Sequence, residues 1–362
     1  MQIGIVGLPF SGKTTLFRTL AQIHLDETSS GGKKETNQAV VKVPDKRLDK
    51  LTDMFNPKKK VNATIEIVDL VSVQKGDNTT SQFNTQFIAR VRNNDALLHI
   101  VRGFRDEAVP HVDGTIDMMR DIRTLEDELI FSDLQFLENR FDKLEKDMKK
   151  PKAKDAAIKE MEVMKKWNEA LSNEIPLREV EMSEDEMKYI KNYQPLTAKP
   201  MLIALNLDEE DVKKADTIVR ELREKVKGKN ISIEPFFAKI EMELSQLNDE
   251  EKQVFMDEYG LTDSPLDRMI FSAYELLGLQ SFFTVGEDEN RAWTIKKGMN
   301  AQESAGAIHT DFYNKFIRAE VVAYEDLINA GSLAACRDKG LLRLEGKEYI
   351  VKDGDILNIR HG

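Results

Sequence analysis

The chain has 362 residues, enough for about two or three domains with their own cores. Its formal net charge of −11 argues against a nonspecific nucleic-acid coat but leaves room for a local basic face. The single cysteine, Cys336, excludes an internal disulfide, and the five histidines lack zinc spacing, so we expect a protein of the reducing cytoplasm. No apolar run approaches the ~18 residues of a membrane span, and the first strand starts at Met1, so we expect no signal peptide.

Residues 7–14 match the pattern of Gly, four residues, Gly, Lys and Ser or Thr that cradles nucleotide phosphates. Residues 3–6 before them are typical of a buried strand, and residues 14–23 after them of an amphipathic helix, so the motif has the order it needs. Lys13 is then expected to reach the outer phosphates and Thr14 to bind Mg²⁺. The alternative is an accidental glycine-rich turn before a helix.

A polar loop at 26–38 occupies the position of the first switch, where nucleotide-dependent proteins present a threonine to Mg²⁺. Thr28 and Thr36 are the candidates, and neither has a convincing setting. We predict a strand at 39–43, a short helix through Leu48, Leu51 and Met54, and a solvated turn at 58–60.

The next strand, predicted at 61–68, places Asp69 at its carboxyl end, where ligands bind in open α/β sheets. We therefore choose Asp69 as the carboxylate of the Mg²⁺ site. Switch proteins continue Asp-x-x-Gly at this point, whereas this chain has Ser72, which lacks the free backbone of glycine. An ordinary strand-terminal aspartate is the alternative.

Residues 74–86 are polar and are expected to form a loop, and residues 96–101 form a further buried strand in which His99 is interpreted as a core residue rather than a ligand. The loop at 109–114 contains His111 and lies near the expected rim of the site.

From residue 115 the pattern changes to a long helix that ends at the basic stretch 149–152, followed by a second helical stripe. The spacing predicts an antiparallel hairpin with a coiled-coil seam, inserted into the sheet domain. We interpret its basic tip as a solvated turn rather than an RNA contact. The apolar positions are Ile130, Leu134, Leu137, Phe141, Leu144 and Met148 going out, and Ile158, Met161, Met164, Trp167 and Leu171 returning.

The sheet resumes at 200–205, followed by Asn206 and a helix to about 226, a strand at 231–237 and helices at 244–255 and 266–277. Guanine-specific proteins read Asn-Lys-x-Asp here, but this chain has Leu207 and Glu209 in place of the lysine and aspartate. A longer carboxylate loses the bidentate geometry, so we expect adenine. The alternative is that Asn206 and Asp208 only cap the next helix.

The last part, 281–362, is predicted to be a small α+β binding module. Its expected elements are strands at 281–285, 291–295, 317–324 and 349–359 and a helix at 301–308.

These stretches together resemble the YchF-type Obg-like ATPases, over nearly the whole chain. The resemblance implies an α/β fold with a P-loop G domain at 1–114 and 198–279, an inserted helical hairpin at 115–197, and a C-terminal TGS domain with a β-grasp fold at 280–362. It also implies ATP preferred over GTP, Mg²⁺ as cofactor and association with the ribosome, with a contact on the large subunit. The stretches that carry it are 43–48, 206–209, 274–277, 291–295, 308–312 and 349–355.

By the same resemblance, the phosphate loop and two later loops hold the nucleotide, and Thr14 holds Mg²⁺; Asp69 remains the carboxylate chosen above for that metal site. The family is thought to use a mobile histidine for hydrolysis, which corresponds to His111; an exposed loop histidine is the alternative. The nucleotide-binding residues carried over are Leu8, Pro9, Phe10, Ser11, Gly12, Lys13, Thr14, Thr15, Asn206, Leu207, Glu209, Ala238 and Lys239.

Several positions depart from the family pattern. Phe10 and Ser11 replace Asn-Val, Ser72 replaces a glycine, residues 77–85 replace a glycine-rich switch, and Lys33 stands where a threonine is expected. We therefore predict a monomeric, cytoplasmic, ribosome-associated ATP-binding protein with weak or partner-dependent hydrolysis, which contacts neither membrane nor specific DNA sequences. The alternative is a degenerate nucleotide-binding adaptor that acts through its hairpin and TGS domains.

Overall fold

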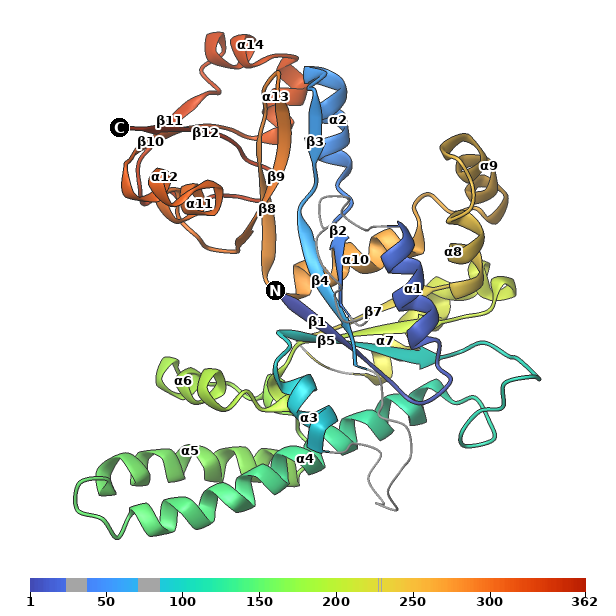
Figure 1. Ribbon diagram of the computed structural model, residues 1–362, viewed down its shortest axis with the longest axis vertical. Coiled ribbons are helices and arrows are strands. Elements are labelled where there is room, and N and C mark those ends of the chain that lie inside the picture. Colours follow the sequence, from blue (N-terminus) through green and yellow to red (C-terminus); the bar gives the residue numbers. More distant parts are fainter. Residues whose placement is uncertain (24–37, 71–84, 227, 229) are drawn as a thin grey trace. The chain divides into compact units, whose positions relative to one another are not determined.

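The computed structural model describes residues 1–23, 38–70, 85–226, 228 and 230–362. The chain forms two compact units (Figure 1): the first contains Met1–Ala39 and Glu66–Met269, and the second contains Val40–Ile65 and Ile270–Gly362. The three-domain division expected above stays a prediction. Within the described ranges, no helix combines the length and the apolar character needed to cross a bilayer.

Most of a six-stranded sheet in the order β2-β4-β1-β5-β6-β7 belongs to the first unit; residues 40–42 of β2 and 64–65 of β4 are assigned to the second. Strand β1 pairs in parallel with β4 and β5, and β5, β6 and β7 are parallel neighbours, so the carboxyl ends of these strands share one edge. Every residue of β5 and β6 is buried, which explains their continuous apolar runs. The strands are β1 (Gln2–Val6), β2 (Gln38–Lys42), β4 (Thr64–Asp69), β5 (Ala96–Arg102), β6 (Met201–Asn206) and β7 (Ile231–Phe236).

Several of the surrounding helices, among them α3, α7 and α8, contribute apolar residues to the core of this sheet. The single helix predicted at 244–255 is wrong, because Asn248 and Glu251 form a reciprocal capping box that starts a new helix. The helix expected after Asn206 begins as a 3₁₀ segment. These elements are α1 (Lys13–Ile23), α3 (Thr85–Arg92), η4 (Glu209–Lys214), α7 (Ala215–Lys225), α8 (Ala238–Leu244), α9 (Asp249–Tyr259) and α10 (Pro265–Leu276).

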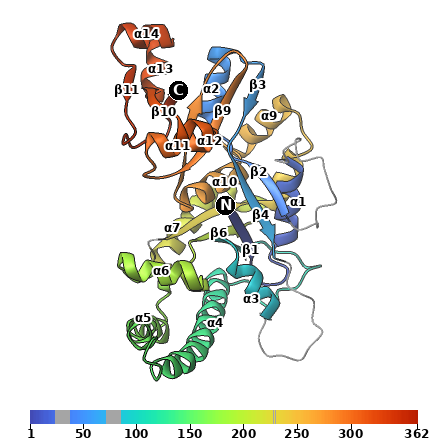
Figure 2. The same cartoon turned by 60° about the vertical axis from the view of Figure 1, so that its left-hand side comes forward.

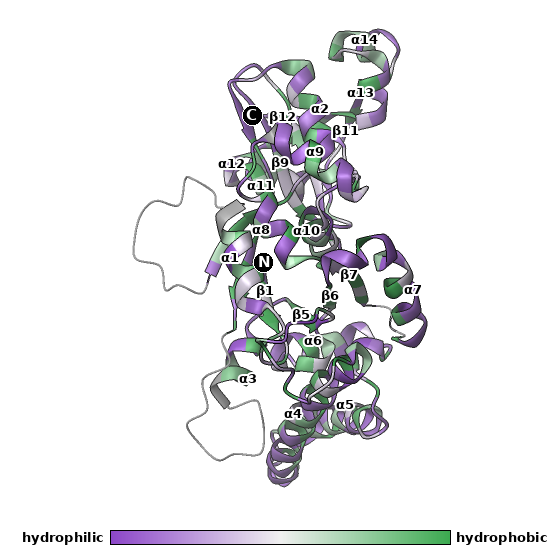
Figure 3. Cartoon of the chain, turned by 90° about the vertical axis from the view of Figure 1, so that its right-hand side faces the viewer, coloured by the Kyte–Doolittle hydropathy of each residue, from purple (hydrophilic) through white to green (hydrophobic). Residues whose placement is uncertain are grey.

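The predicted hairpin is present as α4 (Met118–Asp147) and α5 (Lys154–Ser172), which run side by side in Figures 1 and 2. Purple and green bands along both helices in Figure 3 reflect their amphipathic sequence. Ile130, Leu137, Met164, Trp167 and Leu171 are among the buried seam residues, as predicted. Ile158 is wrong as a seam residue, since it is 38% exposed. The chain returns to β6 through η2 (Leu177–Glu179), α6 (Glu184–Tyr193) and η3 (Leu196–Ala198).

The second unit is α+β, as predicted for the C-terminal part, with a sheet in the order β11-β10-β12-β8-β9-β3. The solvated turn predicted at 58–60 is wrong, because Lys59–Val61 forms β3 and pairs in parallel with β9. The strand predicted at 349–359 is shorter and later, since Gly354 turns the chain at φ +85°. The elements are α2 (Lys46–Phe55), β3, β8 (Leu279–Thr284), β9 (Glu289–Lys296), α11 (Ala301–Ile308), α12 (Thr310–Asn314), β10 (Phe316–Val322), α13 (Tyr324–Ala330), α14 (Leu333–Asp338), β11 (Arg343–Glu345) and β12 (Ile356–His361).

Candidate nucleotide-binding site

A cavity of about 970 Å³ lies in the first unit and is lined by residues that follow β1, β5, β6 and β7 and by Asp69 at the end of β4. Its lining includes all the predicted site residues except Leu8, Ser11 and His111. Six further lining residues were missed by the sequence reasoning, and four of them directly follow β5, a position that the strand-end rule could have indicated. The lining residues are Pro9, Phe10, Gly12, Lys13, Thr14, Thr15, Asp69, Phe104, Arg105, Asp106, Val109, Asn206, Leu207, Asp208, Glu209, Ala238, Lys239 and Met242.

The two motif glycines of the phosphate loop are required by close contacts. Gly7 has φ +143°, and a Cβ there would lie 2.4 Å from the carbonyl oxygen of Ile100. Gly12 has φ +102°, and a Cβ there would lie 2.4 Å from Nδ2 of Asn206. Phe10 adopts φ +62° with 60% of its surface exposed, a left-handed conformation that costs a non-glycine residue about 1–2 kcal/mol. The loop therefore tolerates strain to keep its curled backbone.

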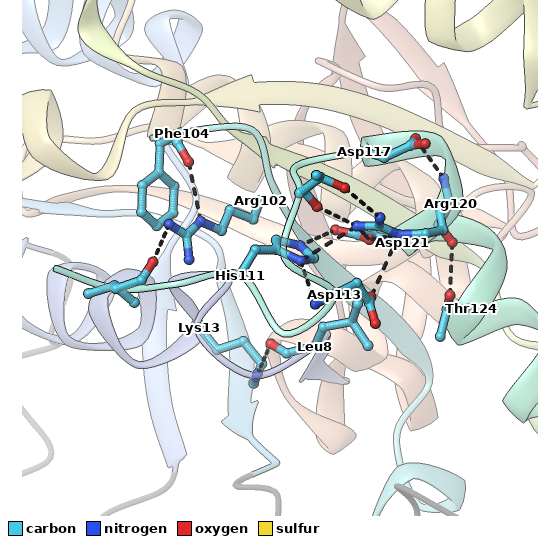
Figure 4. A network of polar contacts seen from close by, with 12 residues as sticks. Leu8, Lys13, Arg102, Phe104, His111, Asp113, Asp117, Arg120, Asp121 and Thr124 are labelled. Atoms are coloured by element: carbon cyan, nitrogen blue, oxygen red, sulfur yellow. Dashed lines mark hydrogen bonds and ion pairs between the residues drawn. The ribbon is translucent and has the colours of Figure 1, made fainter. Parts of the chain in front are cut away.

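Lys13 and Asp69 interact electrostatically at the phosphate-loop end of the cavity. The Lys13 Nζ donates to the carbonyls of Gly7 at 2.8 Å and Leu8 at 2.6 Å, the latter contact drawn in Figure 4, so Leu8 contributes its backbone rather than a lining side chain. Burial lowers the pKa of Lys13 to about 8, and the nearby Asp69 carboxylate opposes that shift. Burial likewise raises the pKa of Asp69, opposed by Lys13. Phosphate oxygens are a natural partner for this partly desolvated ammonium.

The donors for a magnesium site are present at the same end. Thr14 and Asp69 both line the cavity, and they offer a hydroxyl and a carboxylate oxygen, the hard donors that Mg²⁺ prefers. The switch positions that would complete such a site lie outside the described residues: Thr28, Lys33, Thr36 and Ser72.

Asn206 connects three loops around the cavity. Its Nδ2 donates to the Ser11 carbonyl at 3.1 Å, and its Oδ1 accepts from the Ala238 N–H at 3.3 Å. The capping alternative is wrong, because the Asp208 side chain makes no cap bond and instead accepts from the Arg105 N–H at 3.0 Å. Asn206 thus holds the phosphate loop against the loop after β7.

Glu209, the residue in the position of the guanine-reading aspartate, already has partners. Its Oε1 pairs with the Lys239 ammonium, and the Tyr259 hydroxyl lies 3.5 Å from its Oε2. Both oxygens of the carboxylate are therefore engaged at the mouth of the cavity.

His111 lies in the loop between β5 and α4, outside the cavity lining. Its side chain is only 5% exposed, so the exposed-histidine alternative is wrong. Its Nε2 lies 2.8 Å from Oδ2 of Asp121, a contact drawn in Figure 4. A part in hydrolysis therefore stays a prediction for His111.

His99 is a core residue, as interpreted from the sequence. It is 1% exposed, burial lowers its pKa to about 3, and neither ring nitrogen has a hydrogen-bond partner among the described residues. It is neutral at physiological pH.

Comparisons with known proteins agree with this architecture. Residues 2–133 match the MMR_HSR1 family model, described as a 50S ribosome-binding GTPase, and residues 279–362 match the YchF-GTPase_C model, described as a protein of unknown function (DUF933). The chain is 43% identical over 360 residues to the protein named Ribosome-binding ATPase YchF of Bacillus subtilis, covering 99% of this chain and 98% of the relative. This chain belongs to the YchF family.

Other YchF relatives are similar over the full length. The Mycoplasma genitalium protein of the same name is 39% identical, with 99% of both chains covered. The solved structure of the Schizosaccharomyces pombe YchF GTPase superposes with a TM-score of 0.88 at 31% identity, covering 99% of this chain and 97% of the other. The predicted P-loop α/β fold with a C-terminal α+β domain is thereby confirmed for this YchF-family chain.

Proposed function

We propose that this chain binds ATP with Mg²⁺, hydrolyses it slowly without a partner, and associates with the ribosome. The observation that carries the proposal is the cavity, which is lined by the phosphate loop and also by Asn206 and Glu209. Its volume of about 970 Å³ is at the upper end of small-molecule sites, which span roughly 300–1,000 Å³.

At the phosphate end, the backbone of residues 8–13 and the Lys13 ammonium bind and orient the polyphosphate tail. Lys13 exchanges its bonds to the Gly7 and Leu8 carbonyls for phosphate oxygens. Thr14 and Asp69 would hold Mg²⁺, which supplies charge neutralisation between the outer phosphates when bound.

At the base end, the engaged Glu209 favours adenine over guanine. A guanine-reading carboxylate must accept two N–H groups at once, whereas Glu209 already pairs with Lys239 and contacts Tyr259. The free-energy cost of breaking the Glu209–Lys239 ion pair offsets the free energy gained from bonding guanine. Adenine recognition does not require a hydrogen bond to this carboxylate, so ATP is the preferred substrate.

Slow unassisted hydrolysis follows from two features. Ser72 stands where a glycine N–H would contact the outer phosphate, and His111 is turned toward Asp121. Unassisted phosphate-loop GTPases turn over at only about 10⁻⁴ to 10⁻³ per second. We expect a basal rate in that range or below.

The partner is inferred from the relatives, whose names state ribosome binding, and from a matching model described as 50S ribosome-binding. We therefore propose a large-subunit contact by a cytoplasmic monomer.

Isothermal titration with ATP, ADP and GTP in magnesium buffer tests the nucleotide site. We expect ATP to bind at least tenfold more tightly than GTP, Lys13→Ala to abolish uptake, and the exposed-lysine control Lys50→Ala to bind normally. Absence of measurable uptake of any of the three nucleotides would reject the proposal. Pelleting with ribosomes, with and without ATP, tests the partner, and failure to co-sediment in both states would reject it.

The adaptor alternative is favoured by one observation, the loss of the Asp-x-x-Gly glycine at Ser72. A protein without that contact distinguishes ATP from ADP poorly, and a switch responds only through differential affinity. If Lys13→Ala folds, binds no nucleotide and still co-sediments with ribosomes as the unaltered chain does, the adaptor function replaces the switch.

A further inference from the structure

We propose that Asp121 and Arg120, in the first turn of α4, lock His111 outside the nucleotide pocket, and that hydrolysis requires this lock to open. The proposal rests on the proposed function and on the part in hydrolysis that the family resemblance implies for His111. It adds two positioning residues that neither the motifs nor the family resemblance indicated.

The His111 ring has no nitrogen left for a water molecule. Its Nδ1 accepts the N–H of Asp113 at 3.1 Å, which places the proton on Nε2, and Nε2 donates to Oδ2 of Asp121 at 2.8 Å. A histidine that orients or deprotonates water must present a free nitrogen to it. The observed position is therefore incompatible with that role.

The Asp121 carboxylate is buried in the first turn of α4. It is 3% exposed, and its other oxygen, Oδ1, accepts from Nε and Nη2 of Arg120 at 3.1 and 2.9 Å. The positive end of the α4 dipole also favours a carboxylate in the first turn. Arg120 in turn donates from Nη2 to the Thr115 carbonyl at 2.6 Å, so the same pair holds the loop backbone.

The loop that carries His111 is held at the pocket through Val109, two residues before the histidine. The buried Arg102 guanidinium stacks on Phe104 and donates to the Val109 carbonyl at 2.7 Å, and Val109 lines the cavity. His111 follows only two residues later, and two residues span at most about 7 Å. Gly114, at φ +76° with open space where a Cβ would stand, can change its backbone angles freely. A local rearrangement of 110–117 can therefore turn His111 toward the pocket.

The helix that carries Asp121 is itself firmly anchored. Leu125 and Leu129 of α4 are buried in the core of the first unit, and the Asp133 carboxylate accepts from the N–H groups of Leu196 and Thr197. Because α4 is anchored one turn after Asp121 and again near Asp133, opening moves the loop and not the helix.

A metal site at the same place is disfavoured. One ligand atom each of His111, Asp113 and Asp121 lies within 4.8 Å of the others, which could suit a cation. The Arg120 guanidinium already lies against both carboxylates, 2.9 Å from Asp121 and 3.6 Å from Asp113. A positive group thus occupies the position that a cation would need.

The test compares the full-length chain with Asp121→Ala, Asp121→Asn and the control Asp127→Ala, an exposed carboxylate on the same helix. Phosphate release is measured with magnesium and ATP in the absence of ribosomes. We expect Asp121→Ala to raise the rate at least tenfold, Asp121→Asn to raise it less, and Asp127→Ala to leave it unchanged. Adding His111→Ala to Asp121→Ala must return the rate to the basal level.

A second readout does not depend on hydrolysis. Diethyl pyrocarbonate modifies accessible imidazoles, and the exposed His309 serves as an internal reference, with 61% of its side chain exposed. We expect His111 to react much more slowly than His309 in the unaltered chain and at a comparable rate in Asp121→Ala. Asp121→Asn, which keeps the side-chain shape, serves both readouts if Asp121→Ala fails to fold.

The lock is overturned if His111 reacts as fast as His309 in the unaltered chain. It is equally overturned if Asp121→Ala and Asp121→Asn both keep normal nucleotide binding but hydrolyse at or below the basal rate, because Asp121 would then assist His111. Nucleotide titration separates these results from a failure of the proposed function: a chain that binds no nucleotide refutes the latter, while histidine modification still decides the lock.

Discussion

The Asn206 side chain donates a hydrogen bond of 3.1 Å to the carbonyl of Ser11, which joins the end of β6 to the phosphate loop. The same amide occupies the space beside Gly12 that any larger residue would need. One buried residue therefore holds together the phosphate loop, the end of β6 and the start of α8.

Removing this link should weaken nucleotide binding. In Asn206→Ala the Ser11 carbonyl and the Ala238 N–H lose their partner, and each unsatisfied buried group costs about 1–3 kcal/mol. We expect at least tenfold weaker ATP binding by calorimetry and a lower thermal midpoint, with the exposed-residue control Asn192→Ala unchanged. Normal ATP affinity in Asn206→Ala would show that the loops are held by other contacts.

Nucleotide affinity should fall at alkaline pH because of Lys13. In the free protein burial lowers the pKa of Lys13 to about 8, and bound phosphates stabilise the protonated form, so binding above pH 8 requires uptake of a proton. We expect the dissociation constant for ATP to rise up to about tenfold per pH unit above 8. Lys13→Arg keeps its charge and should flatten the profile; an equally steep profile in that variant would assign the effect elsewhere.

Base preference should follow the Glu209 position. Leu207→Lys with Glu209→Asp rebuilds the guanine-reading sequence and releases the Lys239 pair. We expect the ATP-to-GTP affinity ratio to shift at least tenfold toward GTP, measured by competition with a fluorescent nucleotide. The neighbouring conservative change Glu210→Asp is the control. If the double variant keeps the original ratio, selectivity resides in another part of the cavity.

Stability of the first unit should decline as the pH rises from about 4.5 to 7 because of Glu241. Burial raises the pKa of this carboxyl from 4.5 to about 7, although it accepts from the Leu266 N–H at 2.9 Å. The folded state therefore holds the proton more tightly than the unfolded chain, so the contribution is full below pH 4.5 and lost as the pH passes 7. The shift corresponds to at most about 3 kcal/mol.

Urea unfolding at pH 5 and pH 8 measures this effect. We expect the difference between the two midpoints to shrink in Glu241→Gln, which carries no titratable group, and to persist in the exposed-residue control Glu258→Gln. An unchanged difference in Glu241→Gln would mean that Glu241 titrates normally in the folded protein.

Local patterns were sufficient for much of the fold. The phosphate loop between a strand and a helix, the apolar run of β6 and the seam of the hairpin each depend on residues within a few positions of one another. The same reasoning misplaced the break before α9 and the strand at Lys59–Val61, because a capping pair and a distant partner strand decide those elements.

The phosphate-loop motif, the parallel sheet and the helical hairpin were predictable from the sequence, because spacing and residue type encode these features locally, and Ser72 can be read directly in place of the switch glycine. Three side-chain partners could not be predicted from the sequence: Asn206 reaches a carbonyl 195 residues away, Glu209 pairs with Lys239, and His111 faces Asp121. A side chain's partner depends on where the folded backbone brings distant loops together. It also depends on which rotamers the surrounding packing allows a buried side chain to adopt.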